Sequence, residues 1–379
     1  MIKAAYIHIP FCEHICHYCD FNKVFLKGQP VDEYLEFLGK EMRLTLERHP
    51  AARLDSVFVG GGTPTALNEK QLVKLCEIIR THLPYDDGTE YTFEANPGDL
   101  GKEKLQILAA FGVNRLSIGV QSFNDVLLAK IGRKHKAEDV FTAVESARAA
   151  GFENISIDLI YGLPGQTLAD FEETLKIAMS LEIVHCSAYS LIIEPKTVFY
   201  HLMKQGKLSL PGEDAEADMY DMLLAEMGRN GFRQYEISNF SLPGYESRHN
   251  LTYWNNEHYF GFGAGAHSYL DGVRRSNYGP LKKYLQHLKN NELPVFEESA
   301  LTKEEMMEEE MFLGLRKISG VNINVFREKF AENPLDIFAR QLERLKKKEL
   351  IDISPPWIRL TKKGLFLGNE AFQEFIGAL

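Results

Sequence analysis

The chain has 379 residues, 45% of them hydrophobic, and its formal net charge is −10. A chain of this length can bury the core of one large domain and of one or two smaller ones. The acidic balance argues against binding along a nucleic-acid backbone, so no nucleic-acid partner is expected. The first residues resemble no signal peptide, and no stretch is long and apolar enough to span a bilayer. We therefore expect a cytoplasmic protein, for which peripheral membrane contact stays open.

Short apolar runs alternate with segments of helical period from the start of the chain to about residue 193. The runs predict strands over 4–10, 56–59, 91–95, 115–120, 155–160 and 186–193. The segments between them predict helices over 32–47, 69–82, 102–111, 137–150 and 168–181. This alternation indicates an α/β protein with a parallel sheet or an open barrel. Right-handed crossovers bring the carboxyl ends of such strands to one rim, where we expect the polar residues that follow each strand to meet.

The pattern changes after residue 195. An acidic helix is predicted near 213–229, and the region 235–278 is rich in aromatic residues and glycine. From about residue 298, three helices and a short hairpin (350–353 and 358–361) predict a winged-helix-like domain. Its simplest role is to pack against the rest of the protein or to cover it as a lid. We therefore predict domains over 1–200, 201–297 and 298–379. The basic residues near 344–348 are expected to form a solvated helix face.

Three of the five cysteines lie within eight residues, directly after the first predicted strand: Cys12, Cys16 and Cys19. Three thiolates can hold three irons of a 4Fe-4S cluster and leave the fourth iron without a protein ligand. A structural zinc bound by these cysteines and His14 or His17 would explain the same spacing. The other two cysteines, Cys76 and Cys186, are expected to pack as small apolar side chains.

The surroundings of the cysteines favour the cluster. A loop that contains Gly61, Gly62 and Thr63 follows the second strand, and Glu94 follows the third, although a structural zinc needs neither. Together with the cysteines, these residues resemble the radical S-adenosylmethionine (SAM) superfamily. The resemblance implies an open (β/α)6 partial barrel. It also implies that SAM chelates the open iron and that an electron from the cluster cleaves SAM to a 5'-deoxyadenosyl radical.

The same resemblance implies a set of SAM contacts. Tyr18 is expected against the adenine, the Gly61–Gly62–Thr63 loop at the amino group, and Glu94 at the ribose hydroxyls, where a carboxylate accepts two hydrogen bonds. The other expected contacts to SAM or to a second ligand are Tyr6, Gln121, Arg133, Asp158 and His267. Two questions stay open: whether one or two SAM molecules bind, and whether Arg133 and Asp158 form a structural ion pair instead.

Nearly the whole chain resembles the oxygen-independent coproporphyrinogen III dehydrogenase family. The strings that carry the resemblance are YIHIPFC (6–12), GGGTPT (60–65), EANP (94–97) and DLIYGLPG (158–165). True dehydrogenases of that family have a further cysteine two residues after the third, and this position is Phe21 here. They also have a longer leading segment, whereas five residues precede Tyr6. Both departures argue against decarboxylase activity.

A second branch of that family, the HemW-type heme chaperones, has an HNxxYW signature that is present at residues 249–254. The resemblance implies that His249 binds heme, that the protein delivers heme to respiratory proteins, and that an electron donor serves the cluster. It also implies that the cluster and SAM regulate transfer or support a homodimer. Oxygen-independent coproporphyrinogen III dehydrogenase activity is the alternative, so enzyme status stays open. A zinc-stabilised structural protein is the third hypothesis.

Overall fold

Six parallel strands lie side by side in the order in which the chain reaches them. The structure, a computed structural model, describes residues 2–379. The strands are β1 (Ile2–Ile9), β4 (Ser56–Gly61), β5 (Glu90–Ala95), β6 (Arg115–Gln121), β7 (Asn154–Tyr161) and β8 (His185–Ser190). All six correspond to predicted strands, which confirms the predicted α/β fold. Residues of β6 are buried on both faces, as expected for a strand covered by helices outside and by polar groups inside.

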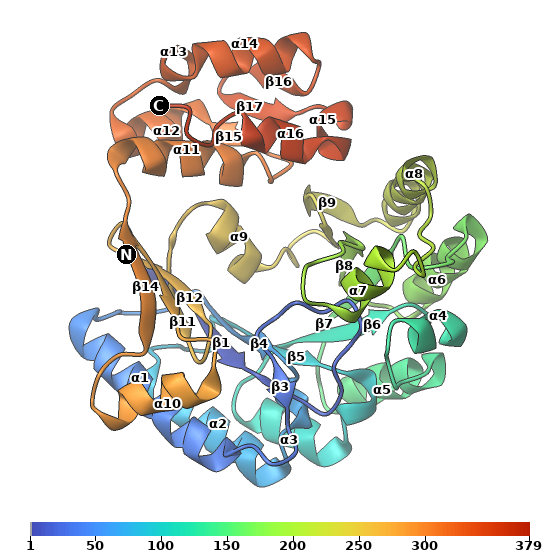
Figure 1. Ribbon diagram of the computed structural model, residues 1–379, viewed down its shortest axis with the longest axis vertical. Helices are drawn as coiled ribbons and strands as arrows, with labels where there is room; N and C mark the ends of the chain where they lie inside the picture. Colours follow the sequence, from blue (N-terminus) through green and yellow to red (C-terminus); the bar gives the residue numbers. More distant parts are fainter. Residues whose placement is uncertain (1) are drawn as a thin grey trace.

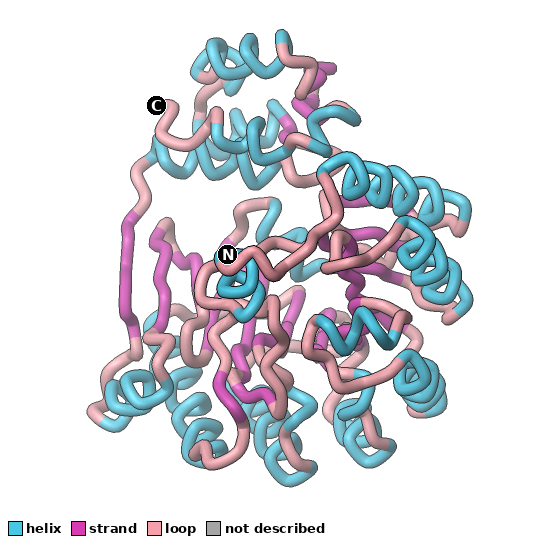
Figure 2. Tube along the Cα trace, turned by 45° about the vertical axis from the view of Figure 1, so that its right-hand side comes forward, coloured by secondary structure: helices cyan, strands magenta, loops and turns pink. Residues whose placement is uncertain are grey.

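The intervening helices form the outer layer. They are α1 (Val31–Arg48), α2 (Glu69–His82), α3 (Lys102–Ala110), α4 (Asp125–Lys130), α5 (Ala137–Ala149) and α6 (Leu168–Ser180), with short 3-10 turns at Pro64–Ala66 and Pro97–Asp99. Figure 1 shows them as an arc around the strands, and the turned view in Figure 2 shows the strands inside that arc. Local sequence sets their ends: α2 begins with a reciprocal capping box between Asn68 and Gln71.

A seventh parallel strand extends the sheet beyond the six that the sequence predicted. Strand β11 (His258–Phe262) pairs in parallel with β1, with Phe260 opposite Ala5. Three antiparallel strands continue that edge, namely β12 (His267–Leu270), β13 (Val273–Asn277) and β14 (Val295–Ala300). At the other edge lie β10 (Asn239–Ser241) and β9 (Arg233–Glu236). The expected extension of the barrel is therefore largely part of the same twelve-stranded sheet.

Four further helices belong to this region: α7 (Val198–Lys204), α8 (Glu213–Arg229), α9 (Arg248–Trp254) and α10 (Leu281–Lys289). A two-stranded parallel pair, β2 (Phe11–Cys12) and β3 (Val24–Phe25), encloses the segment that carries the other two motif cysteines. Among residues 2–379, no helix has the length and apolarity needed to cross a membrane.

The C-terminal lobe lies above the barrel and is joined to it through β14 (Figure 1). Its helices are α11 (Lys303–Gly314), α12 (Ile323–Phe330), α13 (Pro334–Ile337), α14 (Ala339–Lys347), α15 (Lys362–Phe366) and α16 (Gly368–Gln373). A three-stranded antiparallel sheet is formed by β15 (Val321–Asn322), β17 (Trp357–Leu360) and β16 (Ile351–Ser354), so the predicted hairpin is present. The lobe has its own core, centred on Phe326, Phe338 and Phe375. The basic face of α14 pairs with acids, as in the 2.8 Å contact of Arg344 with Glu374.

Candidate functional site

The three motif cysteines line one cavity of about 450 Å³ at the carboxyl ends of the parallel strands. Backbone hydrogen bonds fix the loop that carries them: Val24 N donates to Pro10 O over 2.7 Å and His17 N donates to Ile131 O over 3.0 Å. The Thr63 hydroxyl donates to Cys12 Sγ over 3.7 Å. The loop that contains Gly61, Gly62 and Thr63 is therefore in direct contact with the loop that carries the cysteines.

The donor set fits an iron-sulfur cluster. Cys12, Cys16 and Cys19 surround a cavity, and in a cubane each thiolate binds a different iron. Among the residues described, no three His, Cys, Asp or Glu side chains are grouped as ligands of a single metal ion. His17, a zinc ligand in the alternative hypothesis, has its Nδ1 2.9 Å from Lys130 O. Burial raises the pKa of the Cys12 thiol to about 11, so binding iron there displaces a proton.

The glycine loop is shaped by its contact with the end of β1. Gly62 N donates to Ile9 O over 2.8 Å, and Thr63 N donates to Phe11 O over 2.8 Å. Gly61 has φ +111, and a Cβ on it would lie 2.4 Å from the His8 ring. Only a residue without a side chain fits there, because His8 is itself buried. The loop leaves a cradle next to the cysteines for a small ligand.

Two carboxyl groups face the same cavity. Glu94 accepts a hydrogen bond from Gly61 N over 3.0 Å, and Asp158 accepts one from the Ser117 hydroxyl over 3.2 Å. Burial, with a smaller contribution from the nearby Asp158, raises the pKa of Glu94 to about 7. Burial also raises the pKa of Asp158. Ligand hydroxyl groups that replace water here would find strong hydrogen-bond acceptors.

Arg133, Gln121 and Tyr18 complete the wall of this cavity. Arg133 Nη1 donates to Asn96 Oδ1 over 2.6 Å, and no ion pair joins Arg133 to Asp158 in the part of the chain that is described. The structural ion pair that the sequence left open is therefore not formed. Gln121 has φ +66 at the end of β6, where the pairing with β7 is irregular. That turn brings its side chain to the rim.

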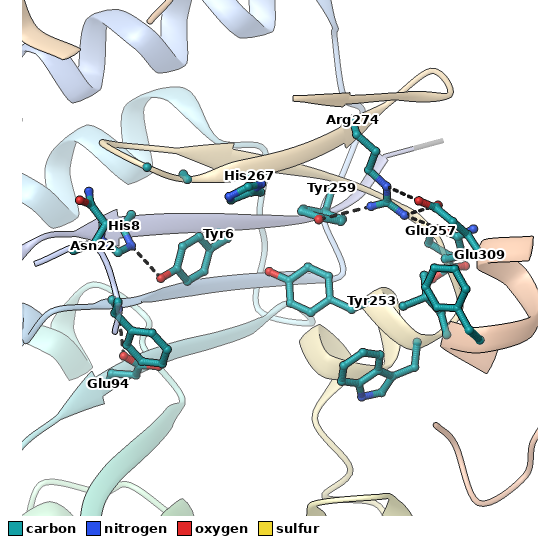
Figure 3. Close-up of a pocket in the computed structure, with 18 residues that line it drawn as sticks. Tyr6, His8, Asn22, Glu94, Tyr253, Glu257, Tyr259, His267, Arg274 and Glu309 are labelled. Atoms are coloured by element: carbon teal, nitrogen blue, oxygen red, sulfur yellow. Dashed lines mark hydrogen bonds and ion pairs between the residues drawn. The ribbon is translucent and has the colours of Figure 1, made fainter. Parts of the chain in front are cut away.

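Two of the predicted SAM contacts lie in a neighbouring cavity. Tyr6 and His267 line a space of about 630 Å³ that also reaches the C-terminal lobe, and they do not line the cysteine cavity. The two cavities share Gly61, Glu94 and Phe21 in their walls, so they adjoin. Figure 3 shows Tyr6 and His267 near each other on the strands that line the second cavity, with Glu94 at one end.

His249 lies outside both cavities. It is buried, with 2% of its surface exposed. Its Nδ1 is 2.9 Å from the Ser56 hydroxyl and its Nε2 is 2.8 Å from the Tyr253 hydroxyl. Burial, and next to it the charge of Arg115, lowers the pKa of His249 to about 3, so the ring is neutral. As placed, neither ring nitrogen has a free lone pair for an iron, and heme ligation by His249 requires one hydrogen bond to break.

Asn22 was not singled out by the sequence, yet it joins the cysteine loop to the second cavity. Its Nδ2 donates to Ala264 O over 2.7 Å and to Gly279 O over 3.1 Å, and its backbone oxygen accepts from His8 Nε2 over 2.7 Å. His8 Nδ1 in turn accepts from the Tyr6 hydroxyl over 3.0 Å. The one available signal was its place three residues after Cys19, because the partners of its side chain are more than 240 residues away.

Comparisons with known proteins agree with this geometry. Residues 6–178 match the Radical SAM superfamily, and residues 301–367 match the HemN C-terminal domain. Coproporphyrinogen III oxidase (HemN) from Escherichia coli, a radical SAM enzyme of known structure, has a TM-score of 0.88 at 26% identity. That match covers 100% of this chain and 91% of that chain.

Two relatives show to which branch of the superfamily the chain belongs. The heme chaperone HemW of Escherichia coli (strain K12) is 37% identical over 265 residues, which cover 70% of this chain and 69% of that protein. The heme chaperone HemW of Bacillus subtilis (strain 168) is 54% identical over 379 residues, which cover 100% of both. The chain therefore belongs to the HemW family of heme chaperones within the radical SAM superfamily.

Proposed function

We propose that this protein binds heme and passes it to heme-requiring respiratory proteins, and that it does so with a 4Fe-4S cluster and SAM bound at the barrel rim. The observation that carries the proposal is the full-length match to a heme chaperone at 54% identity. The arrangement of the rim supports it, because three cysteines and a glycine cradle meet in one cavity that adjoins a larger one.

In this proposal Cys12, Cys16 and Cys19 hold the cluster, and bound SAM and cluster together supply one-electron chemistry. The chain's own groups orient SAM. The glycine loop accommodates its amino group, and Glu94 accepts hydrogen bonds from the ribose hydroxyls. Tyr18, Gln121, Arg133 and Asp158 contribute the remaining contacts, and Arg133 provides a buried positive charge for a carboxylate or a second SAM.

The proposal also includes the location, the partners and the domain organisation of the protein. We place the protein in the cytoplasm, with an electron donor for the cluster and a homodimer whose formation the cluster supports. The separate core of the lobe after β14 supports the proposed boundary at residue 297. The boundary proposed at residue 200 has no such support, because the region 201–297 shares the sheet and the core of the barrel. The C-terminal lobe has a hairpin between α14 and α15, which supports a winged-helix-like domain that covers the barrel.

The test is a heme titration beside an anaerobic coproporphyrinogen assay on one cluster-loaded preparation. We expect stoichiometric heme binding, transfer of the heme to an apo-respiratory hemoprotein, and no protoporphyrinogen. Protein that binds no heme would refute the proposal.

The second candidate is oxygen-independent coproporphyrinogen III dehydrogenase activity. The shared fold with Escherichia coli HemN favours it, and Phe21 at the position of the further cysteine argues against it. Formation of protoporphyrinogen, with consumption of SAM, would favour this activity over a chaperone alone.

A further inference from the structure

The larger cavity lies between the β1 and β11 side of the sheet and the C-terminal lobe. Strands supply Tyr6 and Tyr259, helix α9 supplies Tyr253 and Trp254, and helix α11 of the lobe supplies Phe312. Its volume of about 630 Å³ is in the range of pockets for cofactor-sized ligands. A wall with this many aromatic side chains suits a flat apolar macrocycle, because the rings of the wall can stack against the ring of the ligand.

Two histidines line this cavity, and they differ in their hydrogen bonding. His8 is buried and uses both ring nitrogens, one with the Tyr6 hydroxyl and one with Asn22 O. His267 is exposed, and its ring makes no hydrogen bond within residues 2–379. Figure 3 shows the His267 ring on the strand side of the cavity, above Tyr6 and Tyr253. An imidazole without a hydrogen-bond partner has a ring nitrogen available to ligate a heme iron.

We infer that this cavity takes the heme cargo and that His267, rather than His249, supplies its axial ligand. The inference rests on the proposed function and names the site within it. The role of His249 is then positional: its Nε2 holds the Tyr253 hydroxyl at 2.8 Å, and Tyr253 forms part of the cavity wall.

The C-terminal lobe contributes one wall and is held by an ion pair at the edge of the cavity. Arg274 on β13 donates through Nε and Nη2 to the two carboxylate oxygens of Glu309 on α11, at 3.2 and 2.6 Å. Arg274 also donates to the Asn256 side-chain oxygen over 2.7 Å. Because both side chains are cavity residues, this ion pair fixes the position of the wall that α11 contributes.

The test compares three histidine variants of the cluster-loaded protein by heme titration and by resonance Raman of the ferrous complex. His267→Ala should lose the iron–histidine stretching band and weaken heme binding by about tenfold or more, equal to about 1.4 kcal/mol. His249→Gln should keep the band. His258→Ala is the matched control, because His258 is on β11 but does not line the cavity.

A further variant, His267→Gly, should regain axial ligation when free imidazole is added, and this would exclude misfolding as the cause of the loss. An unchanged band and affinity in His267→Ala, with loss of the band in His249→Gln, would overturn the inference and leave the proposed function intact. A wild-type protein that binds no heme would instead overturn the proposed function itself.

Discussion

The cysteines of the rim and Cys186 differ in what surrounds them. Cys12, Cys16 and Cys19 line a cavity, whereas Cys186 is packed inside β8. Cys12→Ser, Cys16→Ser or Cys19→Ser should abolish the visible absorption of the reconstituted cluster, because each removes one iron ligand. Cys186→Ala should keep the absorption. A cluster of full intensity in the Cys16→Ser protein would show that the site has been assigned wrongly.

Glu41 is a buried carboxyl group on α1 that supports the loop leading to His267. It accepts hydrogen bonds from the Tyr284 hydroxyl over 2.5 Å, from Gly263 N over 2.8 Å and from the Asn277 side chain over 2.6 Å. Burial raises its pKa from 4.5 to about 7. Between these values the folded protein retains a proton that the unfolded chain has released. The contribution of this group to stability is therefore complete below about pH 4.5 and is lost as the pH rises through about 7.

Glu41→Gln, which cannot ionise, should remove this loss. We expect the free energy of unfolding of the wild type, minus that of the variant, to fall by roughly 2–3 kcal/mol between pH 4.5 and pH 7.5, as measured by urea denaturation. Glu36→Gln, which removes a carboxyl group at an exposed position of the same helix, is the matched control for the substitution itself. If the difference between the wild type and Glu41→Gln does not change with pH, the Glu41 carboxyl is ionised in the folded protein over this range.

At the level of single residues, the sequence predicted which residues meet at the rim but not the hydrogen bonds of His249. The contacts that follow the strands, such as Glu94 and Asp158, meet because parallel strands end on one side. The hydrogen bonds of His249 depend on Ser56, which is 193 residues away, and no local pattern encodes that distance. The HNxxYW string predicts heme binding by His249, but whether the ring of His249 is free to bind an iron depends on tertiary contacts.

The glycine loop after β4 is the element whose geometry constrains the site most. Gly61→Ala would place a methyl group 2.4 Å from the His8 ring at φ +111, and His8 is held by two hydrogen bonds. We expect a loss of stability of roughly 2–4 kcal/mol and a large loss of SAM affinity. Gly98→Ala is the matched control, because it lies in the same cavity wall and its Cβ would meet nothing within 4 Å. Isothermal titration with SAM would reveal the difference, and equal affinities would contradict the assigned role of the loop.

Elements of the barrel were predictable because each has a local signature. Apolar β-branched runs identified the six strands, and caps such as Asn68 identified helix starts. Strand β11 was missed as a member of the parallel sheet because its partner β1 is about 250 residues away. Its pairing depends on a crossover through the whole barrel, which periodicity in a short window does not report.

In the whole molecule, the ion pair of Arg274 and Glu309 joins the C-terminal lobe to the sheet of the barrel. A double-mutant cycle with Arg274→Met and Glu309→Gln should give a coupling free energy of about 1–3 kcal/mol, because the pair is bidentate and largely buried. The neighbouring pair Arg275 and Glu298 lies within the sheet, and its Glu298 side chain is 52% exposed, so its coupling should be below about 1 kcal/mol. The couplings are measured by thermal denaturation. If the two pairs give equal coupling free energies, the Arg274–Glu309 contact does not hold the lobe more strongly than an ordinary surface ion pair would.

Electron paramagnetic resonance of the anaerobically reconstituted, reduced protein, recorded before and after addition of SAM, tests whether the three cysteines hold a cluster with an open iron. We expect the signal of a reduced 4Fe-4S cluster whose g-values shift when SAM binds the iron that has no protein ligand. Absence of an iron-sulfur signal, together with about one zinc per chain, would contradict this expectation.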